Sequence, residues 1–458
     1  MSYLLDFYRT FDGEQLAQFK MLDLKGKEEL VRDEYVRYAS GKNFNEQAIP
    51  AKFQLTQKHF DKIVSVLLDK SIVRFYNNDF RTAIPALFRK GLTPLVIHEL
   101  KIIERNLQKS AVKQEQIAFL KIAFETLAAM YHPNFDSKLT HSYGKKYLIA
   151  LGNKATIDDK VYTSLLIHQG DMIAQCFAGN ENSYRSTALA LLQQWEKTLK
   201  KVKSPFALFY FNFISASYVK FFGTEVKPFT DALEKALHYL KQCDAHQQEV
   251  YTFKALCELG FGHVEGGNYL AALQSYTSAF SQLKDAALVG YYQKSCYFNA
   301  CLLVGDLPLA QEVFEQYLKG YLSKGVNRSL QFDVLVNAFT LCLHTSDDKG
   351  SYAYLQQLKA YKKNEITRTA QLIIRVCENL YFYCTKDFAQ SKAIALRNVK
   401  FMARPENKNE QYAYYKGFYD CIYQYSKQRL SGKPISKELL TQRQTLHGGM
   451  YAIFHSLL

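Results

Sequence analysis

The sequence has little proline and glycine and no long apolar run. Nine of the 458 residues are proline and 22 are glycine, below the usual shares of about 5% and 7%, so long uninterrupted elements are favoured. No stretch of 18 or more apolar residues is present, and a membrane-spanning helix needs about that many. The most apolar segment, 206–222, is short and contains Asn212, Ser217 and Lys220. It therefore predicts a buried core helix rather than a membrane segment.

Signs of secretion and of disulfide chemistry are also missing. The nine cysteines form no CxxC pair and stand within apolar runs, as small buried hydrophobic residues do. The first residues, MSYLLDFYRTFDGE, have no preceding basic region and no small-residue cleavage site, so a secretory signal is not supported. We expect free thiols and a cytoplasmic protein.

Motifs of the common enzyme classes are absent as well. GxxxxGK[ST], HExxH and GxSxG do not occur, and the eleven histidines show no pair at metal-ligand spacing. The segment 260–267, GFGHVEGG, resembles a dinucleotide loop, but Glu265 stands where the third glycine belongs. A helical pattern also precedes it, whereas phosphate binding needs a strand there. The sequence predicts no catalytic residue, no metal site and no cofactor, although a catalytic site assembled from distant residues stays open.

What is present is a globular, helical pattern. Hydrophobic residues make up 48% of the chain and charged residues 22%, which excludes a disordered chain. Apolar residues recur with a period of 3.6 in long segments, among them 58–76, 94–108, 112–131, 160–177 and 188–200. These segments predict an all-α protein, and a helical chain of this length raises the question of repeats.

One segment, 253–283, has the pattern of two helices around a tight turn. Small residues, Gly260 and Ala272, stand where the two helices must approach each other, and Leu259 fills the space between them. The dipeptide Gly267-Asn268 supplies a turn that tolerates a positive φ.

This segment resembles the tetratricopeptide repeat, which has a Leu-Gly pair in its first helix and small, aromatic and small residues in its second. Weaker copies of the turn and the second helix follow at 305–317 and 386–395, and others precede it at 229–239 and 78–87. The small-residue anchors at 232, 272, 310, 353 and 391 are 40, 38, 43 and 38 residues apart, longer than the family's 34. The resemblance implies an α-solenoid, a right-handed superhelix of stacked helical hairpins, best matched over 205–405.

Four segments are predicted along the chain. They are an N-terminal helical cap or small module at 1–55, irregular helical hairpins at 56–204, tetratricopeptide-like repeats at 205–405, and C-terminal helices with a cap at 406–458. Breaks at Gly41-Lys42-Asn43 and Pro50 mark the first segment, and Gly448-Gly449 interrupts the last. Caps are expected because an open stack exposes an apolar face at each end.

The resemblance further implies that the first helices of the hairpins line a concave groove. The outward positions of those helices are the candidate partner-binding residues, and the seven that we single out are Phe221, Lys254, Glu258, Phe261, Tyr292, Asn299 and Tyr383. Further groove positions are Glu225, Cys257, Ser295, Ala338, Cys342, Val376 and Leu380. Each apolar position has an alternative role, packing against the next repeat.

Family members that hold a chaperone's C-terminal carboxylate use Lys and Asn in adjacent first helices, and only Asn299 matches that pattern. The mixture of aromatic, polar and charged residues suits an extended or helical peptide with apolar anchors instead. The first functional hypothesis is therefore a non-enzymatic protein-binding scaffold without a membrane contact.

The formal net charge of +15 supports a second hypothesis, a basic helical-repeat protein that binds nucleic acid or another polyanion. Its basic residues cluster near 197–203 (Lys197, Lys200, Lys201, Lys203), 359–368 (Lys359, Lys362, Lys363, Arg368), 397–408 (Arg397, Lys400, Arg404, Lys408) and 427–433 (Lys427, Arg429, Lys433). Each cluster also falls where cations complement a helix dipole. The aromatic run at 412–425 is either a stacking surface or core, and the spacing of Tyr415, Tyr419 and Ile422 favours core.

Overall fold

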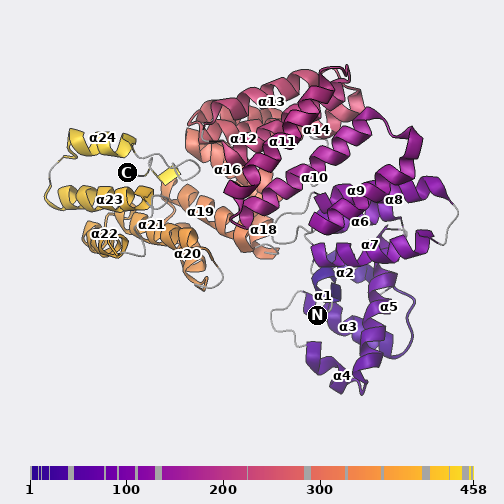
Figure 1. Cartoon of the computed structure of the whole chain (residues 1–458). Coiled ribbons are helices and arrows are strands. Elements are labelled where there is room, and N and C mark those ends of the chain that lie inside the picture. The colour runs from indigo at the N-terminus through magenta and orange to yellow at the C-terminus, as the bar shows by residue number, and fades with distance from the viewer. Residues whose placement is uncertain are drawn as a thin grey trace. The chain divides into compact units, whose positions relative to one another are not determined.

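The protein is helical throughout the part of the chain that the structure describes (Figure 1). This computed structural model describes residues 3–8, 10–11, 13–19, 21–39, 46–76, 79–89, 92–108, 112–128, 137–223, 225–282, 290–324, 328–362, 366–404, 413–432, 434–445, 453–454 and 457. Every regular element in these ranges is a helix and none is a strand, so the all-α prediction is confirmed. The predicted breaks at 41–43 and 448–449 and the start of the copy at 78–87 lie outside the described residues.

The chain forms two compact units. The first contains Met1–Thr224 and His238–Cys243, and the second contains Glu225–Leu237 and Asp244–Leu458. The helix α13 (Lys227–Leu240) contributes residues to both units. The predicted four-segment division remains a prediction, but the repeat segment that begins at 205 in that division has its first helix in the first unit.

The first unit is built from helices packed in chain order. They are α1 (Tyr3–Tyr8), α2 (Gly13–Phe19), α3 (Lys27–Ala39), η1 (Glu46–Ala48), α4 (Ile49–Lys52), α5 (Gln57–Tyr76), α6 (Phe80–Arg89), α7 (Thr93–Gln108), α8 (Lys113–Ala128), α9 (Ser137–Leu151), η2 (Gly152–Lys154), α10 (Ile157–Phe177), α11 (Glu181–Leu199) and α12 (Pro205–Phe222). From α5 onwards each long helix contacts the next, and α1 and α3 contact α5.

One apolar core joins the first 55 residues to the helices that follow. The ring of Tyr8 lies 4.1 Å from that of Phe19, and its hydroxyl is 3.1 Å from the Ser71 hydroxyl on α5. The same core continues to Leu100 and Tyr143. Segment 1–55 is thus packed against the hairpins that follow it.

The most apolar segment of the sequence forms α12, as a core helix. Ser204 caps its N-terminus by accepting a hydrogen bond from the Ala207 N–H, and Pro205 occupies the first turn, where its missing N–H does no harm. Phe209 and Ile214 are fully buried. No helix among the described residues is long and apolar enough to cross a membrane.

The second unit is a series of helical hairpins. Its helices after α13 are α14 (Ala245–Glu265), α15 (Tyr269–Ser281), α16 (Tyr291–Val304), α17 (Leu307–Val313), the π-helical turn η4 (Phe314–Leu318), α18 (Lys319–Lys324), α19 (Arg328–His344), α20 (Asp348–Lys359), α21 (Arg368–Cys384), α22 (Phe388–Met402), α23 (Ala413–Leu430) and α24 (Lys437–Thr445). The first helix of each hairpin contacts the next first helix, in the order α14, α16, α19, α21 and α23. Each second helix contacts the first helix of the following hairpin.

Four hairpins of this unit share one turn. A residue with positive φ precedes a side-chain cap in each, and the pairs are Gly267-Asn268, Gly305-Asp306, Ser346-Asp347 and Lys386-Asp387. Every Asn or Asp of these pairs accepts a hydrogen bond from a backbone N–H three residues later, which satisfies a helix donor that would otherwise be unpaired. The predicted positive φ of Gly267 is confirmed, at +73°.

Small residues mark the same position of each second helix, four residues after the cap. They are Ala272, Ala310, Ser351 and Ser391, all without exposed surface. The predicted anchor at 353 is wrong, because Ala353 is exposed and Ser351 occupies the equivalent position. The close approach at Gly260 is confirmed: an added Cβ would lie 2.8 Å from the ring of Tyr276.

Candidate functional site

The predicted groove residues of α14 share one face of that helix. Lys254 is exposed, Glu258 and Phe261 are half-buried, and spacings of four and three residues bring them into line. The Lys254 ammonium lies 5.7 Å from the ring of Tyr251 one turn earlier. Tyr292, the second residue of α16, is 38% exposed. Because α14 contacts α16, these four residues are an accessible part of the predicted groove in the second unit.

Two predicted groove residues lie inside the stack. Asn299 on α16 is 3% exposed and donates a 3.3 Å hydrogen bond to Oδ1 of Asn337 on α19. Tyr383 on α21 is 7% exposed, and its ring packs on Phe388 and Tyr425. Neither side chain offers a partner an accessible surface, because neighbouring helices cover it.

The remaining predicted groove positions also include both buried and accessible residues. Cys257, Ser295, Ala338, Val376 and Leu380 are buried, as the alternative of packing against the next repeat requires, while Cys342 is half-buried and Glu225 is exposed. Phe221 is half-buried and belongs to the first unit, whereas the other groove positions belong to the second.

A small cavity lies beneath the α14 face. Its lining residues are Phe261, Val264, Tyr276, Cys296 and Asn299, and its volume is about 10 Å³. That volume holds about one water molecule. A peptide anchor therefore has to lie on Phe261 rather than enter beneath it.

Five cysteine thiols of the second unit lie in surroundings that disfavour the thiolate form. Burial raises the pKa of Cys301, Cys342 and Cys384 to about 12, and it raises the pKa of Cys257 and Cys377 as well. A nucleophilic cysteine needs a lowered pKa, because the thiolate is the reactive form. These five thiols have the opposite environment.

Two neighbouring carboxyl groups of the first unit, those of Glu99 and Asp69, have raised pKa values. Glu99 on α7 is 8% exposed, and its Oε1 has no hydrogen-bond partner. Burial, followed by repulsion from Asp69 on α5, raises the pKa of Glu99 to about 7. Burial also raises the pKa of Asp69, while His98 lowers it. Raised pKa values of neighbouring carboxyl groups occur at proton-transfer sites and in structural clusters alike.

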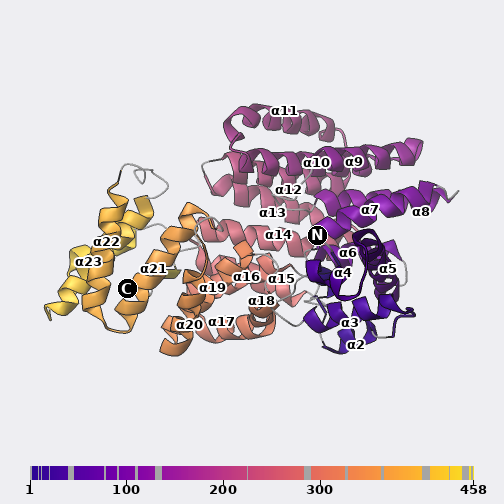
Figure 2. The ribbon, with the colours of Figure 1, turned by 90° about the horizontal axis from the view of Figure 1, so that it is seen from below.

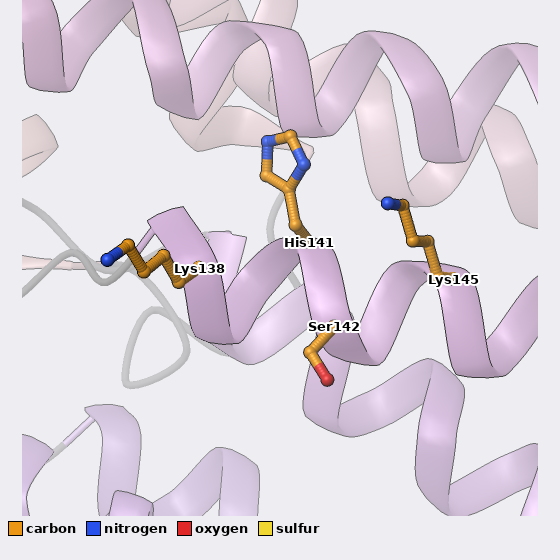
Figure 3. Close-up of a pocket in the computed structure, with 4 residues that line it drawn as sticks. All are labelled: Lys138, His141, Ser142 and Lys145. Atoms are coloured by element: carbon orange, nitrogen blue, oxygen red, sulfur yellow. The ribbon is translucent and has the colours of Figure 1, made fainter.

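An open hollow of about 540 Å³ lies on α9. Its lining residues, Lys138, His141, Ser142 and Lys145, all come from this one helix, and Figure 3 shows one lysine on each side of His141, with Lys138 extending away from it. His141 is held by Asp171 on α10, with 2.8 Å between Nε2 and Oδ2. A hollow lined by a single helix does not surround a ligand on several sides, as small-molecule pockets do.

Arginines from two predicted basic clusters meet at one aromatic ring. The guanidinium carbons of Arg368, Arg375 and Arg404 lie 4.6, 4.2 and 5.4 Å from the ring centroid of Phe401. The first two belong to α21, Phe401 belongs to α22, and Arg404 follows that helix. Neither Phe401 nor Arg375 is among the residues that the sequence singles out. The spacing of seven between Arg368 and Arg375 places both on one helical face and is the signal that points to them.

Charge is unevenly distributed along the second unit. Residues 225–358 contain ten Lys and Arg against fourteen Asp and Glu, a formal net charge of −4. Residues 359–458 contain seventeen against seven, a formal net charge of +10. Lys363, Lys408 and Lys433 of the predicted clusters lie outside the described residues, and the cluster at 197–203 belongs to the first unit.

The aromatic run of α23 is core for the most part. Tyr415, Phe418, Tyr419, Ile422 and Tyr425 are buried, which confirms the core interpretation. The position at 412 is outside the described residues.

No metal site emerges from the described part of the chain, where no three His, Cys, Asp or Glu side chains gather closely enough to hold an ion. No protein-family model matches the sequence, and the comparisons with curated proteins and with solved structures found no match.

Proposed function

We propose that the second unit is a right-handed superhelix of tetratricopeptide-like hairpins and that it serves as a non-enzymatic protein-binding scaffold in the cytoplasm. The observation that carries this proposal is the repeated hairpin: four equivalent capped turns, with successive first helices in contact. Stacked hairpins of this kind present the side chains of their first helices on a continuous surface. The nine free cysteines support a reducing compartment.

Rigidity is the mechanism of binding in this proposal. Phe261 and Tyr292 offer aromatic surface for an apolar anchor, and Lys254 and Glu258 flank it with charges of both signs. Helices held by packing and caps lose little freedom when a peptide docks on them, so less of the interaction free energy is spent on ordering the receptor. The partner that suits this face is an extended or helical peptide with one or two apolar anchors.

Site-specific photo-crosslinking in the native host tests the proposal. Phe261 and Tyr292 are each replaced by p-benzoylphenylalanine, a larger aromatic residue, and the crosslinked proteins are identified by mass spectrometry. The matched control places the same residue at Leu270 on α15, which is 59% exposed. We expect a shared partner from 261 and 292 that is absent at 270. Identical products at all three positions, or none at 261 and 292 in folded variants, would contradict the proposal.

Polyanion binding is a second candidate function, and the +10 charge of residues 359–458 favours it. It does not require the α14 face.

A further inference from the structure

We propose that the basic patch around Phe401 binds the phosphate backbone of single-stranded nucleic acid. The Phe401 patch consists of Arg368, Arg375, Arg397, Lys400, Phe401 and Arg404. It lies on α21 and α22, which Figure 2 shows beside α23, in agreement with their contacts. This binding is independent of the protein-binding scaffold and of the α14 face.

The packing of the arginines on Phe401 orients their guanidinium groups for binding a phosphate. Arg368, Arg375 and Arg404 all lie within cation–π distance of the ring. A guanidinium that stacks on an aromatic face keeps its N–H groups at its edge, where they match the oxygens of a phosphate in pairs. The ring thus orders several flexible side chains before any ligand arrives, which reduces the entropy lost on binding.

The cations of the patch lie close enough to repel one another. Arg375 donates to the neutral oxygen of Asn398 at 3.1 Å. Burial lowers the pKa of Arg375, and Arg397 and Arg368 lower it further, against the opposite effects of Tyr419 and Glu378. Glu378 already pairs with Arg397 at 3.2 Å and with Lys359 at 2.8 Å. A phosphate would relieve the repulsion among these cations.

The fully described run 366–404 has an excess of positive charge. It contains seven cations, Arg368, Arg375, Lys386, Lys392, Arg397, Lys400 and Arg404, against two carboxylates, Glu378 and Asp387. Asp387 is engaged as the cap of α22, where its Oδ1 accepts from the Gln390 N–H. Glu378 is therefore the one carboxylate of this run that faces the cations of α21 and α22.

The extent of the charge favours a polymer over a single phosphate. The formal charge of +10 is spread over the last hundred residues, beyond the patch itself, and a nucleic acid presents one negative charge per nucleotide along its length. Two tyrosine rings also pair in this unit: Tyr352 on α20 is 51% exposed, and its ring is 5.7 Å from that of Tyr381, in the last turn of α21. Bases of a single strand stack on such rings, whereas an acidic peptide makes no use of them.

Fluorescence anisotropy with a labelled oligouridine RNA of about 20 nucleotides tests the proposal on the full chain. We expect the logarithm of the binding constant to fall linearly with the logarithm of the salt concentration. The variant Arg397→Gln/Lys400→Gln/Arg404→Gln removes three exposed cations of the patch. It should weaken binding by about tenfold or more and reduce the salt slope by about two, at roughly 0.7 for each phosphate that the protein no longer neutralises.

A matched control removes the same charge elsewhere in the second unit. Lys227→Gln/Lys235→Gln/Lys349→Gln also replaces three exposed cations, and it should leave the salt slope unchanged because those residues lie outside the patch. Circular dichroism melting of both variants separates loss of binding from loss of fold. Equal weakening by the two variants would overturn the proposal, because it would show attraction to net charge alone.

Two competing polyanions complete the test. Polyglutamate of the same total charge and vesicles containing phosphatidylserine replace the RNA under the same salt conditions. We expect both to bind more weakly than the RNA, with no difference between the patch variant and its control. Tighter binding of either than of the RNA, or no binding of RNA at low salt, would overturn the proposal without affecting the scaffold function.

Discussion

The side-chain amide of Asn299 donates a 3.3 Å hydrogen bond to that of Asn337, and both amides are almost free of solvent contact. Asn299 belongs to α16 and Asn337 to α19, so the bond joins the first helices of two successive hairpins. A buried amide that loses its partner costs about 1–3 kcal/mol. Asn299 is thus a contact within the stack, although its place in the repeat pattern predicts a groove residue.

Removal of one amide should destabilise the second unit. We expect Asn337→Ala to lower the free energy of unfolding by about 1–3 kcal/mol, because Asn299 is left buried without this acceptor. Replacement of both residues by leucine should cost less than the sum of the single leucine variants. Urea unfolding followed by circular dichroism measures each change. Tyr292→Ala, at a 38% exposed position, is the control, and an equal loss in that variant would argue against the role of the amide pair.

Removing a glycine from one of the equivalent turns and introducing a glycine into another should change stability in opposite directions. Gly305 has φ +81° and Lys386 has φ +66°, each directly before a capping aspartate. Gly305→Ala should destabilise by about 1–2 kcal/mol because a Cβ is disfavoured in the left-handed region. Lys386→Gly should stabilise by about 0.5–1 kcal/mol for the same reason. Chemical unfolding of both variants checks the pair, and changes of the same sign would show that the two turns are not equivalent.

The helix contact at Gly260 should tolerate no methyl group. A Cβ there would lie 2.8 Å from the Tyr276 ring, which is 1% exposed and closely packed. We expect Gly260→Ala to destabilise by about 1–3 kcal/mol, as overpacking does. Gly320 in α18 has no atom within 4 Å of its added Cβ, so Gly320→Ala should raise stability by about 0.5–1 kcal/mol. Thermal melting of the two variants compares them, and a stabilised Gly260→Ala protein would contradict the close approach.

Glu99 should make the stability of the first unit fall as pH rises. Its pKa is about 7 in the folded protein against 4.5 for an ordinary glutamate, so between these values the folded state holds a proton that the unfolded state has lost. Linkage then requires the free energy of unfolding to decrease with pH across this window, by about 3 kcal/mol for such a shift.

Glu99→Gln removes this titration and should unfold with a flatter pH profile, most stabilised relative to the wild type above pH 7. Denaturant titrations from pH 4.5 to 8 measure the difference between the two proteins. Glu196→Gln, an exposed glutamate on α11, is the matched control and should keep the wild-type slope. A Glu99→Gln protein with the wild-type slope would assign the pH dependence to other groups.

The local pattern of the sequence predicts the hairpins well, because caps and turns depend on neighbours in the chain. A residue with positive φ and a capping Asn or Asp suffices to end one helix and begin the next, and Gly267-Asn268 and Lys386-Asp387 are visible in the sequence. Where the turn lacks a glycine, the position of the second helix is harder to predict. The turn at Ser346-Asp347 is such a case, and the predicted anchor at 353 is two residues away from the observed one, Ser351.

Long-range packing decides whether a predicted groove residue is exposed or buried. The sequence by itself determines that this chain is helical, that its hairpins recur, and that its last hundred residues are basic, because periodicity, caps and charge are local or additive properties. Only the tertiary structure decides that Asn299 and Tyr383 are buried, because residues from other helices cover them. It alone brings Arg368 and Arg375 of α21 to Phe401 of α22, since helices must pack before side chains distant in sequence share one ring.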